Sequence, residues 1–194
     1  MPKTAPPILG ARYGLALQLA HQMHLTHVRK STDVPYVSHV LSVSAIVLEN
    51  GGDEDTAVAA LLHDVVEDTA LDLDAVGAMF GPVVREIVAG CSDTTGDPGH
   101  KPDWKTRKLA HIEHARRAGE KTRLVLGADK LHNARATLAD LDEQGAETWT
   151  RFNAGADEIV WYYRTMFEVI GESLPTKLRR DLAAAVDALS AWVS

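Results

Sequence analysis

Four residues that can bind a metal ion or move protons lie within one short stretch of this 194-residue chain. The sequence A-L-L-H-D-V-V-E-D-T (Ala60–Thr69) places His63 and Asp64 side by side, and Glu67 and Asp68 follow one helical turn later. In a helix, these four residues would lie opposite a buried apolar stripe of Val58, Leu61, Leu62 and Val65. Three carboxylates and an imidazole at this spacing repel and desolvate one another unless a cation lies among them. The stretch therefore indicates a divalent metal site. The alternative is a solvated acidic helix end that also contains a histidine.

Two further candidate ligands lie elsewhere in the chain. His39 flanks an apolar helical stripe, and Asp129 follows L-V-L-G-A and shares a helical face with Asn133 at i and i+4. With His63 and Asp64 they form a set of two imidazoles and two carboxylates, which suits Mn²⁺, Fe²⁺ or Zn²⁺ and leaves positions open for water or a phosphate oxygen. Such a site is typical of metal-assisted hydrolysis of a phosphate ester or anhydride, in which the remaining two carboxylates of the stretch would move protons.

A short loop upstream brings two cations together. Arg29 and Lys30 stand beside the turn-forming residues Ser31, Thr32 and Asp33. Guanidinium and ammonium groups form charge-assisted hydrogen bonds with phosphate oxygens, so the loop suits a phosphate-bearing ligand. The alternative is a basic loop that is simply solvated.

Bulk properties exclude several classes of function. The formal net charge of −7 argues against general binding of nucleic acids or anionic membranes, although it is compatible with a local basic pocket. No G-x-S-x-G, G-x-x-x-x-G-K-[ST] or G-x-G-x-x-G motif indicates a competing mechanism, and the single Cys91 cannot form an internal disulfide. No run approaches the about 18 apolar residues of a membrane span, and Met1–Leu9 lacks the apolar segment of a signal peptide. We therefore expect a cytoplasmic soluble protein, and a homo-oligomer is compatible with the sequence.

The elements that must position these residues are helices. Apolar residues recur at helical spacing and no segment alternates with a period of two, so the sequence predicts one compact all-α domain over residues 1–194 with about eight to ten helices. The breaker-rich segment Gly96–Trp104, whose His100 and Lys101 could approach a ligand, is predicted to be a loop. The longer predicted helices are Ala11–Thr26, Tyr36–Asn50, one that follows Asp53 and contains Ala60–Thr69, Lys105–Ala118, Lys121–Leu141, Glu147–Ile170 and Lys177–Trp192, with short helices after Asp72 and from Pro82.

The order H…HD…D resembles the signature of the HD metal-dependent phosphohydrolase superfamily, whose fold is all-helical. Longer motifs resemble the hydrolase domain of RelA/SpoT homologues, which degrade the alarmones ppGpp and pppGpp. These motifs are R-K-S-x-x-x-x-P-Y-V-x-H (Arg29–His39), A-L-L-H-D-V-V-E-D-T, F-G (Phe80 and Gly81) and A-D-K-L-H-N-x-R (Ala128–Arg135). The resemblance covers residues 11–141 well and the last 50 poorly, so the helices predicted over 147–192 would complete the bundle. It implies a free-standing small alarmone hydrolase.

The resemblance also implies a role for each matched residue. The ligands of Mn²⁺, which is favoured over Fe²⁺ or Zn²⁺, would be His39, His63, Asp64 and Asp129. The pair that activates water for attack on the 3′-pyrophosphate, releasing pyrophosphate and GDP or GTP, would be Glu67 and Asp68. The contacts to the guanosine nucleotide would come from Arg29, Lys30, Ser31, Lys130 and Asn133, with Tyr162 and Tyr163 as weaker candidates.

Two departures from the family pattern concern the shape of the pocket. Val40 follows His39 where the family usually has proline, and S-T-D-V-P replaces a glycine-containing loop. Two other functions therefore stay open. One is an HD phosphohydrolase for another nucleotide, such as a nucleoside 5′-phosphate or a phosphorylated dinucleotide cofactor. The other is a non-catalytic nucleotide-binding or scaffold protein, against which the intact Glu67 and Asp68 pair argues.

Overall fold

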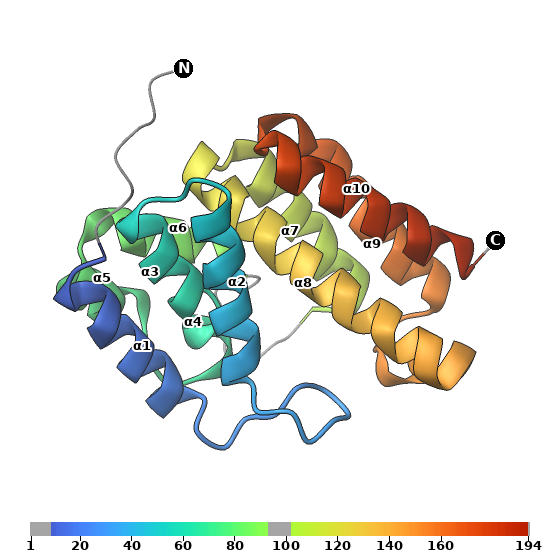
Figure 1. Ribbon diagram of the computed structural model, residues 1–194, viewed down its shortest axis with the longest axis horizontal. Coiled ribbons are helices and arrows are strands. Elements are labelled where there is room, and N and C mark those ends of the chain that lie inside the picture. The colour runs from blue at the N-terminus through green and yellow to red at the C-terminus, as the bar shows by residue number, and fades with distance from the viewer. Residues whose placement is uncertain (1–8, 93–101, 194) are drawn as a thin grey trace.

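The computed structural model describes residues 9–92 and 102–193, and within these ranges it confirms the all-α prediction (Figure 1). The backbone forms ten α-helices and two 3-10 helices there, and its one β-type pairing is an isolated bridge between Val28 and Pro35. The elements in chain order are α1 (Ala11–Met23), α2 (Val37–Glu49), α3 (Glu54–Leu62), α4 (Val65–Asp68), α5 (Leu73–Phe80), α6 (Pro82–Cys91), α7 (Trp104–Arg117), α8 (Glu120–Gln144), η1 (Gly145–Arg151), α9 (Ala156–Ile170), η2 (Gly171–Ser173) and α10 (Thr176–Ala191).

The long helix α8 crosses the middle of the molecule (Figure 1). It packs against α2, α3 and α6 on one side and against α9, α10 and η1 on the other. Gly127 permits the close approach to the C-terminal part, because a Cβ at this position would lie 2.8 Å from Leu174 Cδ2. The helix ends at Gly145, whose φ of 66° lies in the left-handed region that favours glycine. One rigid helix thus carries residues from the core of the molecule to its C-terminal half.

The stretch Ala60–Thr69 combines the predicted apolar stripe with a break that the sequence analysis did not anticipate. Val58, Leu61, Leu62 and Val65 are all fully buried, as predicted. The prediction of one continuous helix is wrong, because α3 ends at Leu62 and α4 begins at Val65. Asp64 leaves the regular helical torsions, with φ −100° and ψ −7°, and its carbonyl accepts the amides of the next turn. His63 and Asp64 therefore form the junction between two helices.

Other boundaries differ in smaller ways. The helix predicted over Glu147–Ile170 is divided into η1 and α9, because the chain leaves helical geometry after Arg151 and α9 starts again behind Gly155. The first helix stops at Met23, three residues early, and the second begins at Val37. Most of the predicted loop Gly96–Trp104, including His100 and Lys101, lies outside the described residues, and Trp104 already belongs to α7. Among the described helices, none combines the length and the hydropathy needed to cross a membrane.

Candidate active site

Four predicted ligands from three parts of the fold converge on one point. His39 comes from α2, His63 and Asp64 from the junction between α3 and α4, and Asp129 from α8. The ligand atoms of His39, His63 and Asp129 all lie within 4.8 Å of one another. Asp64 Oδ2 lies 3.0 Å from His63 Nε2 and 3.5 Å from His39 Nε2. The arrangement has the mixed nitrogen and oxygen donors that a divalent ion uses.

The break between α3 and α4 explains how two adjacent residues serve one point. Neighbours in a continuous α-helix project about 100° apart, so their side chains diverge. At the junction, His63 and Asp64 instead bring Nε2 and Oδ2 to within 3.0 Å of each other. The junction therefore brings both side chains to the same point.

The histidine geometry fits a bound cation. The Nδ1–H of His63 donates to the carbonyl of Ala60 at 2.8 Å, so Nε2 is the ring nitrogen that can bind a metal ion. This Nε2 atom is buried and has no hydrogen-bond partner among the described residues. Burial alone would lower the pKa of His63, yet the carboxylates of Asp64 and Asp129 raise this pKa well above its ordinary value. The cluster of candidate ligands thus favours positive charge, which a bound divalent ion would supply.

Polar neighbours hold the two carboxylate ligands in place. The hydroxyl of Tyr36 donates to Asp64 Oδ2 at 2.5 Å. On α8, Lys130 Nζ donates to Asp129 Oδ2 at 2.7 Å, and Asn133 Nδ2 donates to Asp129 Oδ1 at 2.5 Å. Burial would raise the pKa of Asp129, but the charge of Lys130 and the nearby histidines hold this pKa well below its ordinary value. Asp129 is therefore ionised and oriented before a metal arrives.

The predicted catalytic pair lies beside these ligands. Glu67 and Asp68 line a cavity of about 190 Å³ together with His63, Asp64 and Asp129. Desolvation, followed by the negative charges of Asp64 and Glu67, raises the pKa of Asp68 to about 6, although much of the residue is exposed at the cavity mouth. A carboxyl group with this pKa can hold and release a proton near neutral pH.

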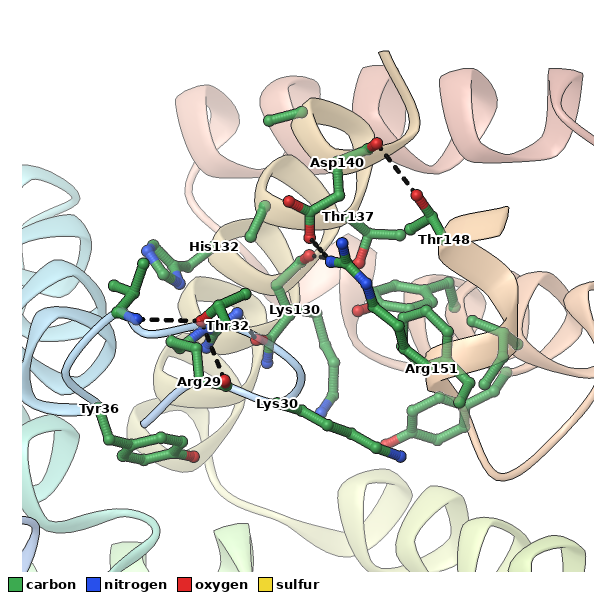
Figure 2. Close-up of a pocket in the computed structure, with 18 of the residues that line it drawn as sticks. Arg29, Lys30, Thr32, Tyr36, Lys130, His132, Thr137, Asp140, Thr148 and Arg151 are labelled. Carbon is green, nitrogen blue, oxygen red and sulfur yellow. Dashed lines mark hydrogen bonds and ion pairs between the residues drawn. The ribbon is translucent and has the colours of Figure 1, made fainter. Parts of the chain in front are cut away.

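A second cavity of about 600 Å³ adjoins the first (Figure 2). Both cavities are lined by four common residues, which mark the passage between them: Tyr36, Lys108, Lys130 and Asn133. Arg29 and Lys30 reach the larger cavity from the loop before α2, and Arg29 NH2 donates to Asn133 Oδ1 at 2.9 Å. The loop that carries the two predicted cations is thus connected to the helix that carries Asp129.

The lining of the larger cavity combines cations with aromatic rings. Its cations are Arg29, Lys30, Lys108, Lys130 and Arg151, and its aromatic residues include Trp104, Phe152, Tyr162 and Tyr163. Arg151 is engaged by Asp140 at 2.6 Å on the α8 wall (Figure 2). A basic, aromatic cavity next to a metal centre suits an anionic ligand with a flat ring system.

Ser31 is the predicted contact that the structure separates from the others. It is exposed, and it is absent from the lining of both cavities. Its φ of 60° lies in the left-handed region, and the neighbouring Thr32 hydroxyl donates to the carbonyl of Arg29 at 2.9 Å. Ser31 therefore shapes the turn that presents Arg29 and Lys30.

Sequence reasoning missed several residues that surround the site. Tyr36 is predicted only as the first residue of its helix, but it precedes α2 and its hydroxyl donates to Asp64 Oδ2. Lys108 and His111 belong to the predicted helix Lys105–Ala118, and the sequence gives neither of them nor His132 a role in the site. His111 lines the smaller cavity and pairs with the Tyr162 hydroxyl at 3.0 Å. The position of His132, three residues after Asp129 on the same helix, was a usable signal.

Comparisons with known proteins agree with this geometry. A family model described as "HD domain" matches residues 16–159. Guanosine-3′,5′-bis(diphosphate) 3′-pyrophosphohydrolase MESH1 of Xenopus tropicalis is 38% identical over 138 residues, which are 70% of this chain and 72% of the frog protein. The protein of the same name from Drosophila melanogaster is 32% identical over 174 residues, covering 88% of this chain and 92% of its own length.

Solved structures and longer proteins extend the comparison. A structure described as a metazoan ortholog of SpoT that hydrolyzes ppGpp is 29% identical, covers 95% of this chain and 97% of its own, and superposes with a TM-score of 0.75. A protein of Listeria monocytogenes EGD-e, also 29% identical, superposes with a TM-score of 0.67 over 77% of this chain and 96% of its own. A probable GTP pyrophosphokinase of Mycobacterium leprae is 37% identical over 62% of this chain, which spans 15% of that protein.

Proposed function

The chain belongs to the HD domain family, and from that premise we propose that it is a manganese-dependent hydrolase of guanosine tetra- and pentaphosphate. It removes the 3′-pyrophosphate of ppGpp or pppGpp and releases pyrophosphate with GDP or GTP. One observation carries the proposal: the donor atoms of His39, His63, Asp64 and Asp129 cluster together, and three of these residues line the smaller of two adjoining cavities, of which the larger is basic and aromatic. Relatives named as 3′-pyrophosphohydrolases of this nucleotide support the substrate.

The preference for Mn²⁺ comes from the resemblance to the RelA/SpoT-homologue hydrolases, and the donor set is compatible with this ion. Two imidazole nitrogens with two carboxylate oxygens suit Mn²⁺, and none of the soft thiolate ligands that select other metals lies in the set. A divalent ion bound there supplies Lewis-acid stabilisation of the phosphoryl oxygens and lowers the pKa of a bound water. The four ligands named above would hold it.

The two remaining carboxylates divide the proton transfers. Glu67 accepts a proton from the attacking water, whose oxygen forms a new bond to the 3′-linked phosphorus. The bond between this phosphorus and the ribose O3′ breaks, and O3′ takes the proton of Asp68. Before a metal binds, desolvation and the negative charges of Asp64 and Glu67 raise the pKa of Asp68 to about 6, which favours the protonated form that a proton donor needs. Asp68 recovers its proton from solvent at the exposed mouth of the cavity.

The arrangement of the two cavities orients the nucleotide. The pyrophosphate lies in the smaller cavity, and guanosine lies in the larger one beside Arg29, Lys30 and the tyrosines of α9. Lys130 and Asn133 border both cavities, so we assign them to the junction where the scissile bond lies. Ser31 contributes by holding the turn that presents its two cationic neighbours. Residues 1–194 act as one domain, in which α9 and α10 pack on the helix that supplies Asp129.

One assay tests the function. The purified protein is incubated with ppGpp and Mn²⁺, and products are separated by anion exchange beside reactions with pppGpp, nucleoside 5′-phosphates and a phosphorylated dinucleotide cofactor. Appearance of GDP and pyrophosphate from ppGpp is the expected result. Cleavage of only the other panel members would move the protein to a different substrate within the family. No turnover with Mn²⁺, Fe²⁺ or Zn²⁺ would favour a nucleotide-binding protein without catalysis.

A further inference from the structure

The metal-ligand histidines are oriented in two different ways. His63 is fixed by the backbone, since its Nδ1–H donates to the carbonyl of Ala60 at 2.8 Å. His39 is fixed by a side chain, since its Nδ1 lies 2.8 Å from Nδ1 of His132 and the two ring centroids are 4.9 Å apart. His39 is 1% exposed, so solvent does not substitute for this contact. The orientation of His39 therefore depends on the identity of residue 132.

Only one assignment of protons in this pair leaves His39 able to bind a cation. Two nitrogens at 2.8 Å must share one proton, with one ring as donor and the other as acceptor. If His39 accepted at Nδ1, its own proton would sit on Nε2, which lies 3.2 Å from Asp129 Oδ1 and 3.5 Å from Asp64 Oδ2. That N–H would point into the ligand set and exclude a metal. If His39 donates from Nδ1, its Nε2 is bare and faces the ligands.

We propose that His132 is a positioning residue for the metal centre: its Nδ1 accepts a hydrogen bond from the Nδ1–H of His39 and so directs the bare Nε2 of His39 at the ion. The inference rests on the divalent ion of the proposed function. It adds a role for α8, because one turn of this helix supplies both the ligand Asp129 and the group that orients a ligand on α2.

The location of His132 makes this role specific to the side chain. The residue is half-buried and lines the larger cavity near Arg29 and Asn133 (Figure 2). Its ring therefore borders the proposed nucleotide pocket while it contacts the ligand His39. A side chain that lines the larger cavity thus orients His39, whereas a peptide carbonyl orients His63.

Metal affinity in the absence of nucleotide tests the role of His132. Three variants are compared with the wild type by calorimetric titration of the metal-free protein with Mn²⁺. His132→Leu keeps an apolar volume but removes the acceptor. His132→Asn places Oδ1 near the position of the imidazole Nδ1 and restores an acceptor. His114→Leu makes the same chemical change at an exposed position of α7 and serves as the matched control.

We expect His132→Leu to weaken Mn²⁺ binding by roughly 10- to 100-fold, the usual effect of losing a group that orients a ligand. The affinity of His132→Asn for Mn²⁺ should stay within about threefold of the wild-type affinity, and that of His114→Leu should equal the wild-type affinity. Unfolding by urea in excess chelator shows whether each variant is folded. The role of His132 is refuted by wild-type affinity in His132→Leu, or by equal losses in the Leu and Asn variants. If the wild type itself binds no Mn²⁺, the proposed function and this inference both fail, which is a distinct outcome.

Discussion

Acid should destabilise this protein through His24, a buried histidine outside the metal ligands. His24 is 2% exposed, its Nδ1 lies 3.1 Å from Nδ1 of His27, and its ring packs against Tyr36 with centroids 4.8 Å apart. Its buried Nε2 has no hydrogen-bond partner among the described residues. Burial lowers the pKa of His24 to about 4, because the opposing effect of the Asp64 carboxylate is smaller and the neighbouring histidines act in the same direction as burial. The folded state therefore resists a proton that the unfolded chain accepts readily.

The sign and size of the effect follow from this pKa difference. An unfolded histidine has a pKa of about 6.5, so between pH 6.5 and 4 the unfolded state binds more protons than the native state. The contribution of His24 to the free energy of unfolding is complete above pH 6.5 and is lost as the pH falls toward 4. The full difference of about 2.5 pH units corresponds to about 3 kcal/mol, with a slope near pH 5 of about 1.2 kcal/mol per unit.

The assay measures a difference in pH dependence and does not depend on absolute stability. Urea unfolding of the wild type and of His24→Leu is followed at several values between pH 7 and pH 4, in chelator so that metal release does not contribute. The leucine variant should lose about 3 kcal/mol less than the wild type over this interval. His21→Leu, an exposed change on the same helix, should follow the wild type. Parallel curves for the wild type and His24→Leu would refute the reasoning.

Further expected outcomes concern the site and its packing. Glu67→Gln should bind Mn²⁺ normally, while its kcat falls at least about 100-fold. Asp129→Ala should not bind Mn²⁺. Equal loss of Mn²⁺ binding in both variants would contradict the division of roles. Lys108→Met should raise KM for ppGpp about tenfold by removing a cation shared by both cavities, and an unchanged KM would place the pyrophosphate elsewhere. Gly127→Ala should lower the free energy of unfolding by about 1–3 kcal/mol in urea titrations, because its Cβ would lie 2.8 Å from Leu174 Cδ2. An unchanged free energy would mean that the side chain of Leu174 moves aside.

The sequence predicted the parts of the fold that depend on periodicity. The apolar stripe around Leu61 and Leu62 is fully buried as expected, and Asp129 and Asn133 share a helical face and a hydrogen bond of 2.5 Å. Both predictions rely on spacing within one helix, where the rise and twist per residue are fixed. The all-α class could be predicted for the same reason.

Local interruptions could not be predicted from periodicity. His63 keeps helical torsions, with φ −60° and ψ −30°, and the apolar pattern continues unchanged from Leu62 to Val65. The break lies at Asp64, whose φ of −100° and ψ of −7° depart from regular helical torsions, and the hydrophobic periodicity does not signal this local change. Contacts between distant segments could not be predicted from the sequence pattern either. The contact between His39 and His132, for example, joins residues 93 positions apart in the chain.

The separation of the proposed metal ligands from the proposed catalytic carboxylates follows from the same break. His63 and Asp64 converge because they lie between two helices, while Glu67 and Asp68 lie one turn further along, on α4. Tyr36 donates to the ligand Asp64, whereas Asp68 keeps a raised pKa of about 6 near solvent. A continuous helix would spread these acidic residues around its surface. The break instead gives them two environments: Asp64 is held in place for the proposed metal ion, and Asp68 can exchange protons. The chemistry proposed for the stretch therefore depends on the two residues at which its helix is interrupted.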